Sequence, residues 1–132
     1  MKIKKSQIEV LFAVLKGTEG VVKLEEARIR DSFLTKLITE YELFQKERNE
    51  ILEKFCEKDE EGNIKTTKDK DNNTIYHFPA ENTELVNKEL DILINEEVDV
   101  ESNPFIKNIA EKTEYTPKIG EADIIDDIMK NI

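Results

Sequence analysis

The sequence predicts a mainly α-helical protein, in which a long central helix is accompanied by shorter packed helices and a small β-hairpin. Three observations predict this helix–hairpin–helix class. The stretch from Val22 to about Lys58 contains neither proline nor glycine. Apolar residues recur along it at alternating spacings of three and four. Two β-prone runs around a polar turn come next, within residues 63–79. We expect a helical domain over residues 1–113 and a linker plus C-terminal amphipathic helix over 114–132, with no internal repeat.

The N-terminal segment predicts a short helix that folds back on the next part of the chain. Ser6 and Glu9 have the spacing of a capping box at its start. Gly17 lies where a helix C-cap glycine belongs. The apolar residues Ile8, Leu11 and Leu15 fall on one face.

The central helix carries an apolar seam with heptad spacing. The seam consists of Leu34, Leu37, Tyr41, Phe44, Arg48, Ile51 and Phe55. Arg48 is its polar irregularity, of the kind that sets register or oligomeric state. A helix of this length measures roughly 50 Å, so the seam must be covered by this chain, by copies of it or by a partner. An ordinary intramolecular core and an assembly surface both remain open.

The polar stretch from Asp69 to Asn73 begins like a calcium-binding loop, with oxygen-bearing side chains at alternate positions. An EF-hand loop needs glycine at position 6 and glutamate at position 12. Thr74 and Ala80 occupy those positions. We therefore interpret the stretch as a solvated hairpin turn, with the β-prone runs "IKTT" and "TIYHF" as its arms.

The remaining segments predict three further helices. The first is capped by Asn82 or Thr83, ends near Glu96 and carries on one face the apolar residues Val86, Leu90, Leu93 and Ile94. The alternating residues 96–102 predict a short edge strand. Asn103 and Pro104 are typical of a helix start, and the apolar side of that helix consists of Phe105, Ile106, Ile109 and Ala110. The last helix groups Ile124, Ile125, Ile128 and Met129 on one face, which either lies in a partner's groove or folds back onto the parent helix.

Composition excludes several classes of function. Asp and Glu number 30 against 20 Lys and Arg, a formal charge of −10, which argues against direct nucleic-acid binding and against an anionic membrane. Cys56 is the only cysteine, so no internal disulfide forms and a cytoplasmic location is expected. The first residues lack the pattern of a signal peptide. Protein partners, including further copies of this chain, are the expected ones.

Catalytic and metal-binding patterns are not found in the sequence. Cys56 and His77 are the only residues of their kinds, too few for zinc, and nothing around them activates a nucleophile. Carboxylate pairs such as Glu25-Glu26 are typical of exposed helix faces, and no phosphate-binding glycine loop occurs. We expect no catalytic residues, no cofactor and no metal, and therefore no enzyme.

The order of segments resembles a family of small phage and prophage proteins of unknown function, encoded near the structural genes of tailed phages. The stretch from Arg48 to Asn63, "RNEILEKFCEKDEEGN", carries most of the resemblance, and "ELDILINEEV" at 89–98 carries the rest. The resemblance covers about the first hundred residues and implies a role in virion assembly or an accessory phage function. Prefoldin-type chaperones have a similar order of helix, hairpin and helix, but the second helix here is too short to pair along the first.

These observations predict a non-enzymatic protein-interaction protein, acting in phage head or tail assembly or as a chaperone-like adaptor. Its contact candidates are the seam residues Leu34, Leu37, Tyr41, Phe44, Ile51 and Phe55 and the C-terminal residues Ile124, Ile125, Ile128 and Met129. The alternative is an acidic inhibitor that blocks a host nucleic-acid-binding enzyme by imitating the charge of its substrate.

Overall fold

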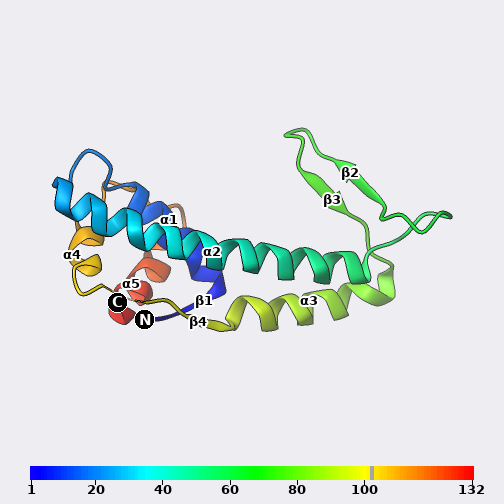
Figure 1. The fold of residues 1–132 in the computed structure, drawn as a ribbon. Helices are drawn as coiled ribbons and strands as arrows, with labels where there is room; N and C mark the ends of the chain where they lie inside the picture. The colour runs from blue at the N-terminus through cyan, green and yellow to red at the C-terminus, as the bar shows by residue number, and fades with distance from the viewer. Residues whose placement is uncertain (102) are drawn as a thin grey trace. The chain divides into compact units, whose positions relative to one another are not determined.

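The computed structural model describes residues 1–101 and 103–132 (Figure 1). These residues form two compact units. Unit 1 comprises Met1–Leu43 and Asn95–Ile132, and unit 2 comprises Phe44–Ile94. Helix α2 (Leu24–Phe55) contributes residues to both units. The mainly helical class, the long helix and the small hairpin confirm the prediction. The C-terminal helix belongs to unit 1, and the boundary expected after residue 113 stays a prediction.

The described residues of unit 1 form four α-helices or parts of α-helices and one two-stranded antiparallel sheet. Its helices are α1 (Ile8–Lys16), the first part of α2, α4 (Ile106–Glu111) and α5 (Glu121–Asn131). Strand β1 (Lys2–Lys4) pairs with β4 (Glu97–Asp99), with Ile3 opposite Val98. The edge strand expected within 96–102 is thus present at 97–99, whereas Ser102 lies outside the described residues. Strand β1 was not predicted, because its partner lies far along the chain.

The core of unit 1 is built by all of its elements. Its fully buried side chains come from β1, α1, α2, α4 and α5, namely Ile3, Ile8, Leu11, Leu15, Leu37, Ile106, Ile109 and Ile128. Thr18 and Arg30 are buried polar residues of this unit. The Arg30 Nη1 atom donates to the Thr18 hydroxyl at 3.2 Å, and that hydroxyl donates to the Leu15 carbonyl at 2.6 Å. Every buried side-chain nitrogen and oxygen in the described residues has a hydrogen-bond partner.

The interactions that start and end α1 differ from those that the sequence suggested. A 3₁₀ turn over Lys5–Gln7 precedes the helix, and the Lys4 backbone N–H donates to Gln7 Oε1 at 3.0 Å. The expected pairing of Ser6 with Glu9 is therefore wrong, since α1 begins only at Ile8. Gly17 does end the helix, as predicted.

The reason for glycine at position 17 is space rather than backbone conformation. Its φ of −67° is accessible to any residue. However, a Cβ atom at Gly17 would overlap Thr113 Oγ1 and lie 2.8 Å from the Tyr115 backbone nitrogen. Glycine thus lets the segment after α4 approach the end of α1.

Unit 2 consists of the last part of α2, a β-hairpin and helix α3 (Ala80–Asn95, of which Asn95 belongs to unit 1). Strands β2 (Thr66–Lys68) and β3 (Thr74–Tyr76) pair antiparallel, which confirms the predicted hairpin. The prediction that Asn82 or Thr83 caps α3 is wrong, because α3 already begins at Ala80. The Asn82 Nδ2 atom instead donates to the Phe55 carbonyl at 3.0 Å and so terminates α2.

The segment between α2 and α3 contains two turns of the same geometry. Oδ1 of Asp59 and Oδ1 of Asp69 each accept backbone N–H groups two and four residues further on, all at 2.9 Å. The residue three positions after each aspartate has positive φ, 83° at Gly62 and 64° at Asn72. The stretch that starts like a calcium loop forms the turn of the hairpin, as interpreted from the sequence, and the structure adds that Asp69 caps this turn. The recurrence of this turn is hard to see in the sequence, because the two copies share only the aspartate and the final asparagine.

Candidate interaction surfaces

The first half of the predicted seam lies in the core of unit 1. Leu34 is buried and Leu37 is 0% exposed, while Tyr41 is half-buried against the same core. A partner could not reach Leu37 unless unit 1 opened. For these residues the intramolecular alternative describes the structure.

The C-terminal helix also folds back within unit 1. Ile128 is only 2% exposed, and Ile124, Ile125 and Met129 are partly buried against the core. The Gln7 Nε2 atom donates to the Asp127 carboxylate at 2.6 Å, which ties α5 to the start of α1. The structure therefore shows this helix folded back within the chain, where it contacts α1 and β1.

The second half of the seam, in unit 2, is much less covered. Phe44, Ile51 and Phe55 are half-buried, and Arg48 is exposed to solvent. Among the residues of unit 2, all of which are described, the buried apolar ones are Cys56, Val86 and Leu93. Unit 2 therefore has a narrow apolar strip between its helices rather than a closed core.

Helix α3 adds two exposed apolar residues that sequence reasoning missed. Leu85 is 48% exposed and Ile92 is 57% exposed. They lie seven residues apart, so both project from the same side of α3. This seven-residue spacing could have identified them in the sequence. They were missed because each lies one position before Val86 or Leu93, which belong to the predicted apolar face. We refer to Phe44, Ile51, Phe55, Leu85 and Ile92 as the unit 2 apolar surface.

Negative charge is divided equally between the two units. Residues 44–94 carry eight Lys or Arg and 13 Asp or Glu, a net charge of −5, which leaves −5 of the total −10 for unit 1. Basic side chains are paired with acids in both units, for example Lys36 with Glu101 at 2.8 Å and Lys54 with Glu89 at 3.8 Å. Acidic and basic groups are thus interspersed.

The candidate nucleophile and the only histidine have structural contacts. Cys56 is buried, and its Sγ atom lies 3.4 Å from the Glu53 carbonyl oxygen as a hydrogen-bond donor. His77 is exposed, and its Nε2 atom lies 2.9 Å from the Thr67 hydroxyl across the hairpin. Within 1–101 and 103–132, no group of three or more His, Cys, Asp or Glu residues is placed to hold a metal ion. No helix in those ranges has the length and apolar character needed to cross a bilayer.

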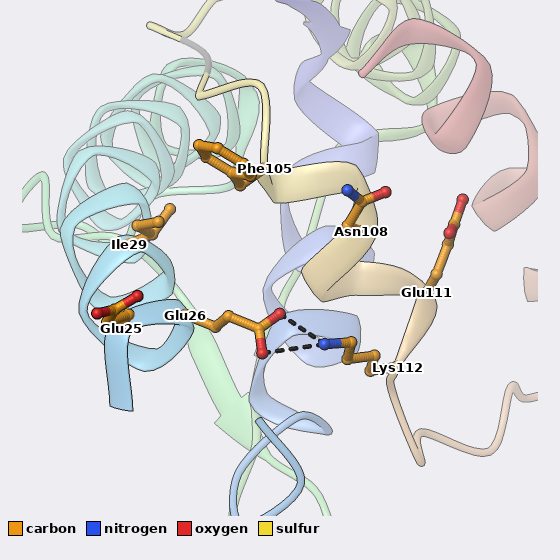
Figure 2. A pocket seen from close by; sticks show the side chains of 7 residues that line it. All are labelled: Glu25, Glu26, Ile29, Phe105, Asn108, Glu111 and Lys112. Atoms are coloured by element: carbon orange, nitrogen blue, oxygen red, sulfur yellow. Dashed lines mark hydrogen bonds and ion pairs between the residues drawn. The ribbon is translucent and has the colours of Figure 1, made fainter. Parts of the chain in front are cut away.

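Unit 1 has an open pocket of about 570 Å³ between the first turns of α2 and helix α4 (Figure 2). It is lined by Glu25, Glu26, Ile29, Phe105, Asn108, Glu111 and Lys112. The Lys112 ammonium donates to both oxygens of Glu26, at 2.7 and 2.9 Å. This contact, helped by the Lys23 backbone N–H, holds the pKa of Glu26 below its ordinary 4.5.

The sequence did not point to this pocket. Glu25 and Glu26 were interpreted as an exposed helix face, and Phe105 was assigned to the apolar side of its helix. Phe105 instead precedes the first residue of α4 and is 56% exposed, unlike its buried neighbours Ile106 and Ile109. Only the folded chain brings its ring beside Ile29.

Comparison of this chain with protein-family models, with curated proteins and with solved structures finds no match.

Proposed function

We propose that this protein is a non-enzymatic protein-interaction protein that associates with further copies of itself through the unit 2 apolar surface. The observation that carries the proposal is the contrast between the two halves of α2. Leu34 and Leu37 are buried in unit 1, whereas Phe44, Ile51 and Phe55 continue the same heptad pattern in a half-exposed environment.

Because unit 2 has only two helices, it leaves apolar side chains uncovered, and further helices can pack against them. A helical hairpin buries only the strip between its helices, and a stable helical core needs a third or fourth helix. A second copy would supply the missing pair. A twofold arrangement places the same surface on both sides of the contact, so one set of apolar residues covers both copies.

The narrower role rests on the resemblance to small phage proteins. We propose assembly of a tailed-phage head or tail, or a chaperone-like adaptor function, in which the paired unit 2 surfaces hold copies together or hold a phage structural protein. The exposed positions of Leu85 and Ile92 support a contact role, since large apolar side chains at the surface favour burial by a partner.

The charge of the chain supports a second candidate, an acidic inhibitor of a host nucleic-acid-binding enzyme. The formal charge of −10 favours basic partners. Against this candidate stand the ion pairs that interrupt the acidic surface and the equal charge of the two units. We therefore place self-association first.

Replacing Leu85 and Ile92 with serine tests the proposal. Both side chains are about half exposed, so the change should leave folding intact while weakening self-association at least tenfold. The matched control replaces Leu24 and Ile119, one leucine and one isoleucine exposed on unit 1. Sedimentation equilibrium measures the dissociation constant of each variant. Equal weakening in both, or in neither, would contradict the proposal.

A further inference from the structure

We propose that the pocket between α2 and α4 binds a lysine or arginine side chain from a basic segment of a partner protein. The pocket lies wholly within unit 1. The proposal therefore adds a second, chemically different surface and does not depend on self-association through unit 2.

The pocket offers an apolar contact to the stem of such a side chain. Ile29 from α2 and Phe105 from the start of α4 face each other across it (Figure 2). Phe105 is exposed although the two nearest isoleucines of α4 are buried in the core. The methylene groups of lysine and arginine cover exposed apolar surface in this way and leave their charged ends in water. The open face of the Phe105 ring also attracts a cation.

The rim of the pocket carries unpaired negative charge. Three glutamates and one lysine line it, and Lys112 is committed to both oxygens of Glu26. Within the described part of the chain, no basic side chain pairs with Glu25 or Glu111. A net charge of −2 thus remains at the opening, one charge on α2 and one on α4.

Charge complementarity selects the occupant. Phosphate groups and acidic peptides would be repelled by Glu25 and Glu111. A bare divalent cation would find no set of three ligating side chains among the described residues. A basic side chain satisfies both features at once, because its stem contacts Ile29 and Phe105 while its charged end meets the net negative charge at the opening. The charge of −10 on the whole chain would steer a basic partner toward the protein.

The test uses the full chain labelled with ¹⁵N and a synthetic probe, the capped peptide Gly-Arg-Leu-Arg-Gly, followed by amide chemical shifts. We expect saturable shifts at Ile29, Phe105 and Asn108. Replacing Glu25 and Glu111 with glutamine should weaken the peptide about fivefold, the effect expected for two solvent-exposed ion pairs. The control replaces the exposed acids Glu42 with glutamine and Asp123 with asparagine. It removes the same two negative charges from unit 1, but away from the pocket.

A further pair of variants separates the apolar contact from the charges. Phe105→Ala should weaken the peptide, whereas Ile119→Ala, at another exposed apolar position, should leave its affinity unchanged. Shifts spread over the acidic surface, or equal weakening by the Glu42 and Asp123 control, would overturn the proposal in favour of general charge attraction. Peptide binding that is lost only when Leu85 and Ile92 are replaced would also overturn it, since those residues belong to unit 2.

Discussion

Replacing one residue in each half of the α2 seam tests whether the two halves differ as the structure requires. Leu37 and Ile51 belong to the same heptad pattern, and their side chains are equal in size. Leu37 is fully buried in unit 1, while Ile51 is half-buried in unit 2. We therefore expect Leu37→Ala to destabilise the protein much more than Ile51→Ala does.

The expected magnitudes depend on burial. Truncating a fully buried leucine to alanine costs about 2–5 kcal/mol, because a transfer loss and a cavity add together. Ile51 loses only about half of its transfer free energy and leaves no closed cavity, so about 1 kcal/mol is expected. For a chain of this size, these values correspond to melting temperatures lowered by about 8–20 °C for Leu37→Ala and about 4 °C for Ile51→Ala.

Thermal unfolding followed by circular dichroism measures both effects. Low protein concentration is required, since self-association would stabilise the folded state through mass action. Amide hydrogen exchange at Leu11 and Ile109 reports on unit 1 separately, because the two units need not unfold together. If Ile51→Ala destabilises as much as Leu37→Ala, or exposes the unit 1 amides equally, the division of the seam into core and surface is wrong.

Two further changes test local contacts. Asn82→Ala removes the side chain that donates to the Phe55 carbonyl, so it should lower the free energy of unfolding by about 1 kcal/mol in urea titrations. The control Asn87→Ala, at an exposed position of α3, should cause no such loss. The pKa of Glu26 is depressed below 4.5 in the folded state, so its ion pair stabilises the protein at neutral pH. That stabilisation should be lost as pH falls from about 4.5 through the lower folded-state pKa. Glu26→Gln should flatten this part of the curve of melting temperature against pH, and an unchanged curve would contradict the assignment.

The elements set by local sequence were predictable. The absence of glycine and proline from 22–58 predicted α2 to within a few residues, and polar turn residues predicted the hairpin. Gly17 was placed correctly as a helix end, although its cause is a long-range contact with Thr113. Propensity and spacing act over a few residues, which is the range of these features.

Features that depend on distant residues were not predictable. Strand β1 exists because Ile3 meets Val98, and Asn82 caps a helix that ended 27 residues earlier. Heptad spacing alone could not divide the seam, since Leu37 and Ile51 carry the same pattern and only tertiary packing buries the first. The pocket beside Phe105 arises in the same way, because α2 and α4 meet there only in the folded chain.

The solution mass of the unmodified chain, measured by light scattering over a range of concentrations at low and high salt, tests self-association most directly. We expect an oligomer whose mass exceeds 15.4 kDa and which persists or strengthens at high salt. Salt screens the repulsion between units of charge −5 and leaves apolar contacts intact. A mass of 15.4 kDa at all concentrations would contradict self-association and move the acidic inhibitor to first place.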